Sequence, residues 1–548
     1  GVARVAAWRL EGGGRVSVDV LVSAAKCALA GFDAAGAERL ARAAVAADAD
    51  VEGMLVLARS LRAQGRWQDA LEILDEAAAV ATGAALAAVA HQQAVVLFHG
   101  LDRGEQADRA LRAAERAVSD PSLRAELAID RAELALFRGQ PAQAVELADA
   151  VIGRAGASDS VGVRAATVIA PALVEAGSPD RALAVVDAQL PVALRLREEL
   201  PAAPGQLLIG RCYALWMSGR LEEMRQLTET MIGACLERHD SEGAAICELF
   251  AGRVAMMRGE LRDAARRLRE ASGLLREADP AHYLQWSLSA LAQAYAQSGE
   301  LEQAAAAITQ AQACVGEGGR LFEDELGLAR AWLAAGRGEL SRAQSLAGET
   351  ASKMAARGQK SAELFALHDL VRLGAPALAT PRLGELAGAF EGVLAPALAA
   401  HGAALAAADG AALEQAAATF AGLGYPLLAA EASAEAASAY RRAGWPLDAG
   451  LAAARCQQWL QACEAPVTPA LALAGRPPSV DELTAREREI AALAARGQST
   501  PQIAQTLVVS QRTVSNHLYH LYAKLGISSR DQLAALLAKE PERGAQDE

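Results

Sequence analysis

The amino-acid sequence predicts an all-α protein, an α-solenoid of helical hairpins that is followed by a small four-helix domain. Hydrophobic residues make up 52% of the 548 residues, but aromatic residues only 4%. Ala, Leu and Val must therefore form most of the core, and the residues that favour strands are scarce. A chain of this length is too long for one compact core. A repeat of about 40 residues and a change of charge near the C-terminus complete the prediction.

One pattern recurs along most of the chain: a Gly, four residues and then an Ala. Its copies begin at Gly65, Gly139, Gly177, Gly259, Gly299 and Gly338, and a variant with Met224 begins at Gly219. From Gly139 onward, successive copies are 38 to 42 residues apart. Gly can end a helix in a left-handed conformation, and the small Ala lets the next helix approach closely. The pattern resembles tetratricopeptide (TPR) repeats, so residues 1–382 are predicted to form a TPR-like array.

Proline residues mark the predicted boundaries after this array. Pro376 and Pro381 predict a break, so residues 383–463 are interpreted as irregular closing helical repeats. Four Pro residues between 464 and 481 exclude a continuous helix and predict a linker. Residues 482–540 are then predicted to be a separate domain, and residues 541–548 a disordered tail.

Capping residues divide the C-terminal domain into four short helices. The first helix is predicted to start at Thr484, which forms a capping box with Glu487, and to stop near Gly497. The second starts at Ser499 or Thr500 and stops near Leu507, and the third starts at Ser510 and stops near Gly526. The fourth starts at Ser528 or Ser529. Two helices that are joined by a tight turn, the second capped by Ser, are the layout of a helix-turn-helix unit.

The third helix of this domain has two different faces. A stripe at helical spacing consists of Val514, Leu518, Leu521 and Leu525 and predicts the buried face. The opposite face carries Arg512, Ser515, Asn516 and Tyr519 and has no carboxylate. Asn can pair with adenine in the major groove, Ser with several base edges, and Tyr with phosphate. The alternative, an ordinary solvated face, is normally rich in Glu.

Charge is unevenly divided along the chain. The formal net charge is −13, a sum that by itself argues against a nucleic-acid partner. Residues 483–538 contain six basic and three acidic residues, so they carry +3 and the remainder carries −16. A basic module on an acidic body is typical of phosphate binding at one end of a chain.

The same residues resemble the LuxR-type DNA-binding domain. The matching positions are Leu483, Thr484, Arg486, Glu487, Glu489, Ile490, Gly497, Ser499, Ile503, Ala504, Leu507, Ser510, Thr513, Val514, His517, Lys524, Leu525, Gly526, Ser529 and Arg530. The resemblance implies that Ser515, Asn516 and Tyr519 lie at base edges, that Arg512, Thr513 and Lys524 lie near phosphates, and that the fourth helix forms a dimer. The segment Thr500-Pro501-Gln502 departs from the usual family pattern, so altered phosphate contacts are expected at the second helix, without a change of fold.

The region from Arg9 to about Cys463 is similar to the helical-repeat portion of the large ATP-binding LuxR-type regulators. In those proteins an ATPase domain precedes the repeats. The sequence contains no GxxxxGK[ST] motif, so no cofactor is expected in this chain, and ATP only if an upstream ATPase domain has been removed. The alternative, a shortened relative, remains open.

Taken together, the resemblance implies a bacterial DNA-binding transcriptional regulator whose repeat body senses an effector or a partner protein. Its expected partners are double-stranded promoter DNA, RNA polymerase and a second copy of the chain on DNA. We expect a cytoplasmic, nucleoid-associated protein with no membrane contact, no catalytic residues and no metal site, because neither a nucleophile–base arrangement nor HExxH is present. The alternative is a helical-repeat interaction scaffold in which DNA binding is secondary.

Overall fold

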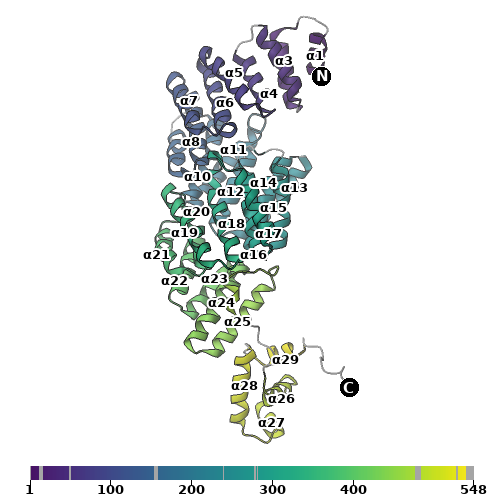
Figure 1. Cartoon of the computed structure of the whole chain (residues 1–548), viewed down its shortest axis with the longest axis vertical. Coiled ribbons are helices and arrows are strands. Elements are labelled where there is room, and N and C mark those ends of the chain that lie inside the picture. Colours follow the sequence, from purple (N-terminus) through teal and green to yellow (C-terminus); the bar gives the residue numbers. More distant parts are fainter. Residues whose placement is uncertain are drawn as a thin grey trace.

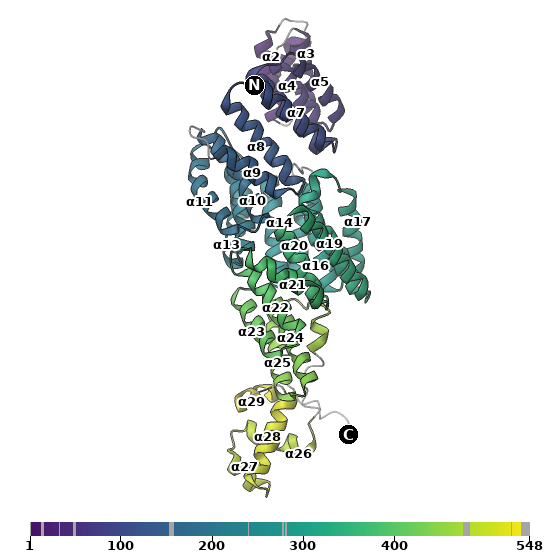
Figure 2. The same ribbon diagram turned by 90° about the vertical axis from the view of Figure 1, so that its left-hand side faces the viewer.

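The protein is described by a computed structural model that covers residues 2–11, 16–31, 33–47, 51–152, 158–238, 240–276, 279, 282–474, 483–525, 527 and 529–538. Every element in these ranges is a helix. The predicted all-α class is therefore confirmed. Figures 1 and 2 show an elongated molecule in which hairpins stack from α2 to α25, with the C-terminal domain beyond α25.

The helices fall into three groups along the chain. The first group is α1 (Val2–Glu11), α2 (Val18–Ala30), α3 (Ala34–Ala46), α4 (Val51–Arg62), α5 (Trp67–Val80), α6 (Gly83–Val95), η1 (Val96–Gly100), α7 (Gly104–Ala117), α8 (Pro121–Phe137) and α9 (Pro141–Ile152). The second group is α10 (Asp159–Glu175), α11 (Pro179–Arg195), α12 (Ala203–Met217), α13 (Leu221–Arg238), α14 (Ser241–Met257), α15 (Leu261–Leu275), α16 (Tyr283–Ser298), α17 (Leu301–Ala313), η2 (Glu317–Phe322), α18 (Glu323–Gly336) and α19 (Leu340–Arg357). The third group is α20 (Lys360–Arg372), α21 (Pro376–Gly388), α22 (Leu394–Ala406), α23 (Gly410–Gly422), α24 (Pro426–Ala443), α25 (Pro446–Leu460), η3 (Leu471–Ala474), α26 (Ala485–Ala495), α27 (Thr500–Thr506), α28 (Gln511–Leu525) and α29 (Arg530–Ala538).

The predicted Gly–Ala pattern forms the turn of most hairpins. From α4 to α25, each even-numbered helix turns back into the following odd-numbered helix. The Gly of six predicted copies adopts a positive φ, as at Gly65 with φ 72° and Gly299 with φ 86°, and the Ala five residues later is fully buried. The turn before α7 is different, because Asp102 takes the left-handed conformation there and Gly104 begins α7.

The hairpins coil into a superhelix whose successive turns touch. Three glutamates reach back across one turn and accept hydrogen bonds from the backbone N–H groups that begin an earlier helix. The pairs are Glu317 Oε2 with Gly104 N (2.8 Å), Glu391 Oε2 with Asp180 N and Arg181 N (3.0 and 3.1 Å), and Glu464 Oε2 with Arg262 N and Asp263 N (2.7 and 3.1 Å). Glu317, Glu391 and Glu464 are 213, 211 and 202 residues from Gly104, Asp180 and Arg262. Because one repeat has about 40 residues, one superhelical turn contains about five repeats. A carboxylate at a helix N-terminus also compensates the unpaired N–H groups and the helix dipole there.

A buried ionic network holds the closing hairpins together. Arg372 of α20 donates to both carboxylate oxygens of Glu431 in α24, at 2.7 and 2.9 Å, and to Asp369 at 2.9 Å. Its guanidinium lies 4.4 Å from the ring centroid of Trp332 in α18, and the Trp332 indole N–H donates to Asp369 at 2.8 Å. All four side chains are buried, so α18, α20 and α24 share one desolvated set of charges.

The predicted boundary at residue 382 needs correction. It lies inside α21, which contains Pro381 in its interior and Pro376 in its first turn. The first turn of a helix does not need the N–H that Pro lacks, and Pro381 removes only one further backbone bond. The array therefore continues without a break through α22–α25.

The first part of the predicted linker is fastened to the body. Glu464 N donates to Gly259 O at 2.8 Å, Val467 N donates to Gln297 O at 2.6 Å, and η3 follows against α24. The predictions for residues 475–481, for the stop at Gly526 and for the tail 541–548 lie outside the described residues.

Candidate nucleic-acid interface

The first helix of the C-terminal domain is fixed by the predicted capping box. Thr484 Oγ1 accepts from Glu487 N at 3.2 Å, and the Glu487 carboxylate accepts from Thr484 N at 2.8 Å. Lys524 of α28 also donates to Glu487 Oε2, at 2.6 Å. Burial opposes ionisation of Glu487, but the Lys524 ammonium and the Thr484 hydrogen bonds outweigh it and lower the Glu487 pKa to about 2. This cluster joins the start of α26 to the end of α28.

The turn between α27 and α28 has no Gly, as the sequence indicates, and Val508 takes the left-handed conformation instead. Its φ is 53° and its side chain is 89% exposed. A β-branched residue is strained in this region. Ser510 then begins α28: its hydroxyl accepts from Thr513 N at 3.0 Å and contacts Thr513 Oγ1 at 2.7 Å. The N-terminal turn of α28 is therefore capped within the domain.

The predicted buried stripe of α28 is confirmed. Val514, Leu518, Leu521 and Leu525 join Leu483, Ile490, Ile503 and Leu533 in a core that is separate from that of the body. The opposite face is open: Arg512, Ser515, Asn516 and Tyr519 are exposed, although another part of α28 approaches α25. The structure therefore gathers the residues with predicted base contacts on one accessible helix face, free of carboxylates.

The predicted phosphate-contacting residues differ in how they are held. Arg512 makes no hydrogen bond or ion pair with any residue that the structure describes, so its guanidinium is available. The Thr513 hydroxyl contacts Ser510, and Lys524, whose side chain is 41% exposed, is paired with Glu487. Sequence spacing did not reveal the Lys524–Glu487 pair, because its partners lie on two different helices.

Two other basic residues of the domain also have internal partners. Arg530 donates to Gln498 O and, at 2.8 Å, to Thr500 Oγ1, so it ties the start of α29 to the α26–α27 turn. Arg486 donates to Leu507 O at 3.0 Å and pairs with Glu489 at 2.7 Å. Part of the +3 charge of the domain therefore stabilises its own fold.

The described residues contain no group of three or more His, Cys, Asp and Glu that could hold a metal ion. Among the same residues, no helix is long and apolar enough to cross a membrane. Sequence reasoning also missed a pocket in the body, described below, whose aromatic lining comes from five separate elements.

Residues 481–537 match the family model for bacterial regulatory proteins of the luxR family. A putative HTH-type transcriptional regulator of Mycobacterium tuberculosis is 53% identical over 51 residues, which are 9% of this chain and 6% of that protein. The spore germination protein GerE of Bacillus subtilis is 39% identical over 57 residues, which are 10% of this chain and 77% of that protein. The crystal structure of the APC/C hetero-tetramer Cut9-Hcn1 superposes on 96% of this chain and 97% of its own, with 14% identity and a TM-score of 0.47.

A capped helix-turn-helix with an exposed, carboxylate-free third helix is the arrangement of a helix-turn-helix DNA-binding domain. The chain belongs to the luxR family of bacterial regulatory proteins, and the relationship is carried by its C-terminal domain. It spans only 6% of the length of the putative HTH-type regulators of Mycobacterium bovis and Mycobacterium tuberculosis that it matches.

Proposed function

We propose that the protein is a DNA-binding transcriptional regulator in which α28 reads the major groove of promoter DNA. The observation that carries this proposal is the exposed face of α28, on which Ser515, Asn516 and Tyr519 stand beside the unpaired Arg512. Asn516 reads a base, Ser515 and Tyr519 contact base edges, and Arg512, Thr513 and Lys524 hold phosphates.

The acidic body supports a division of labour between the two regions. The chain outside residues 483–538 carries −16 and repels DNA, so that only the C-terminal domain makes the contact. In this proposal the repeat body senses an effector or partner protein, α29 pairs two copies on DNA, and the bound protein acts on RNA polymerase in the cytoplasm, at the nucleoid. The chain does this without catalysis and without a nucleotide of its own, so that binding of ATP by this chain alone would contradict the proposal.

The test begins with genome-wide DNA capture to find a bound sequence, followed by gel shifts on that sequence. Asn516→Ala should weaken specific binding by about 1–3 kcal/mol and relax the preference at one base pair. Arg512→Ala should weaken all sequences equally and reduce the salt slope by about one. Lys524→Ala should have the same effect on the salt slope if the Lys524 ammonium leaves Glu487 for a phosphate.

Arg337→Ala is the matched control, because it removes an exposed positive charge from the repeat body. Its affinity should equal that of the unchanged protein. If the Asn516 and Arg512 variants also bind normally, the base and phosphate assignments are wrong.

The regular array also supports a second candidate, a scaffold whose main work is protein or effector binding. Deletion of residues 479–548 distinguishes the scaffold from the transcriptional regulator. The hydrophobic core of the repeat body includes no residue of that segment, so the body should stay folded. A scaffold retains its cellular activity after this deletion, whereas a transcriptional regulator loses it.

A further inference from the structure

A cavity of about 240 Å³ lies within the repeat body. It is lined by α8, α10, α12, α14 and α16, and η2 closes it from the next turn of the coil. Its volume is below the usual range for ligand pockets, about 300–1,000 Å³. A ligand that fits it has few non-hydrogen atoms.

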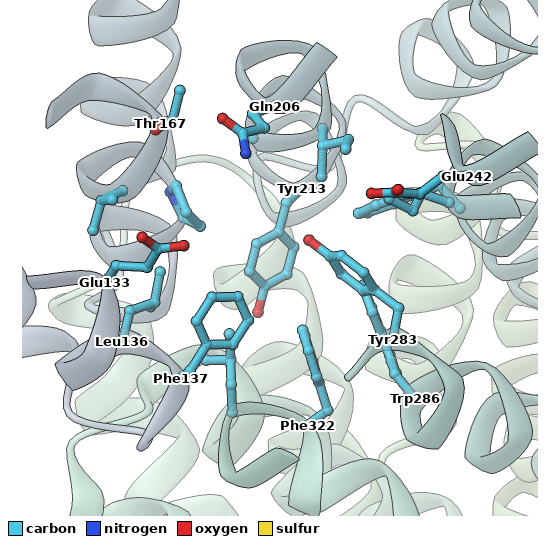
Figure 3. Close-up of a pocket in the computed structure, with 17 residues that line it drawn as sticks. Glu133, Leu136, Phe137, Thr167, Gln206, Tyr213, Glu242, Tyr283, Trp286 and Phe322 are labelled. Atoms are coloured by element: carbon cyan, nitrogen blue, oxygen red, sulfur yellow. The ribbon is translucent and has the colours of Figure 1, made fainter. Parts of the chain in front are cut away.

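Aromatic side chains dominate the lining, although the chain has only eight Phe, seven Trp and seven Tyr residues. Six of them line this one cavity: Phe137, Tyr213, Phe250, Tyr283, Trp286 and Phe322. The rings of Trp286 and Phe322 are stacked with centroids 4.6 Å apart, and Phe250 meets Trp286 edge-on at 5.3 Å. Figure 3 shows Phe137, Tyr213 and Tyr283 converging on the cavity from different helices. Such a concentration of rings offers several negative π faces to a ligand.

The charged groups of the lining are all acidic. Glu133 and Glu242 lie on opposite sides of the cavity (Figure 3), and no Lys, Arg or His is among the lining residues. Glu133 is half-buried and has no hydrogen bond or ion pair with any described residue. Burial, followed by the nearby Asp130 carboxylate, raises the Glu133 pKa. A positive ligand group would supply the partner that the protein does not.

A second acidic layer lies behind the rings. The Tyr213 hydroxyl donates to Glu175, which is buried and whose pKa is raised to about 7, mainly by burial. His91 and Arg164 act electrostatically on Glu133, but both are paired with Asp130, at 3.0 and 2.8 Å, and Arg253 is paired with Glu325 at 2.8 Å. No cation of the described residues therefore enters the cavity to neutralise Glu133.

We propose that this cavity is a binding site for a small organic cation, an amine or quaternary ammonium compound with an apolar body. Its charged head lies against the aromatic faces with Glu133 as the counter-ion, and its apolar body lies against Trp286 and Phe322. Aromatic cages favour such cations through the ring quadrupole. The role of this ligand as the effector rests on the proposed function, whereas its binding does not.

The test is isothermal titration calorimetry of the full chain, without DNA, with choline, benzyltrimethylammonium and 3,3-dimethyl-1-butanol, the neutral isostere of choline. Both cations should bind, and the neutral isostere should bind at least about tenfold more weakly. Equal binding of choline and the neutral isostere would mean that the site recognises shape and not charge. Binding of the neutral isostere alone, or of none of these compounds at millimolar concentration, overturns the proposal.

Two matched variants locate the site. Glu133→Gln keeps the shape of the side chain and should reduce the affinity for both cations about tenfold or more. Glu146→Gln makes the same change at an exposed position of α9 and should leave the affinity for both cations unchanged. Equal affinities of the two variants, with unchanged thermal melting, would exclude Glu133 as the counter-ion. A gel shift with Asn516→Ala is a separate measurement, so failure of DNA binding and failure of cation binding are distinguishable.

Discussion

The repeat body and the C-terminal domain are built from the same element, the α-helix, but they are stabilised over very different distances along the chain. In the body, the carboxylates of Glu317, Glu391 and Glu464 bind helix N-termini more than 200 residues earlier. In the C-terminal domain, the pair between Lys524 and Glu487 spans 37 residues. A small domain with local contacts leaves a recognisable pattern in its sequence, whereas a coil with remote contacts leaves only its repeat.

The largest expected effect is a loss of stability in the repeat body that leaves the C-terminal domain unchanged. Arg372→Leu leaves the carboxylates of Glu431 and Asp369 buried without a counter-charge and should destabilise the body by about 3–5 kcal/mol. Every Trp residue of the chain lies outside residues 483–548, so denaturation followed by Trp fluorescence reports on the body. Unfolding of the C-terminal domain, followed by calorimetry, should not change.

The control for this prediction is Arg342→Leu, which breaks an exposed pair with Glu339. Exposed pairs contribute about 0–1 kcal/mol. Equal destabilisation by the two variants would show that the Arg372 network does not hold the closing hairpins together.

A smaller effect is expected at the contacts between superhelical turns. Glu391→Ala removes the carboxylate that caps α11 and should cost about 1 kcal/mol of body stability, as loss of a helix cap does. Glu349→Ala, an exposed position of α19, should cost less in the same urea titration. If neither variant shifts the transition, the capping contact does not stabilise the coil.

The smallest effect is expected in the C-terminal domain and has the opposite sign. Val508→Gly relieves a strained φ at an exposed position, so it should raise the stability of this domain by up to about 1 kcal/mol. Gln505→Gly, at an exposed position inside α27, should lower it, because Gly is unfavourable in a helix interior. Calorimetry of the full chain distinguishes the two shifts. Destabilisation by both variants would mean that the turn is not strained at Val508.

The local features of the fold were predictable from the sequence. The Gly–Ala turns, the capping box at Thr484 and the buried stripe of α28 each depend on residues close together in the chain, and the structure confirms them. The prediction of a break at Pro381 is wrong. One Pro in a helix removes a single backbone hydrogen bond, and the packing of α21 against α20 and α22 offsets this loss.

The remote features were not predictable from spacing. Glu133 and Phe322 line the same cavity, although 189 positions separate them in the sequence. Nothing in the local sequence around Trp286 distinguishes a ligand-facing ring from a packing ring. The Lys524–Glu487 pair was missed for the same reason, because it depends on how α26 and α28 cross. The face of α28 was found, and its role in DNA reading stays a prediction.

The attachment of Glu464 and Val467 to the coil also limits how far the C-terminal domain can travel. Because the chain is held to the body as far as Ala474, only the eight residues 475–482 precede Leu483, where the next core begins. Even fully extended, such a tether spans about 30 Å, less than one helical turn of DNA, about 34 Å. Any surface that α28 meets is therefore within one short tether of the large acidic body, which must occupy the space beside it.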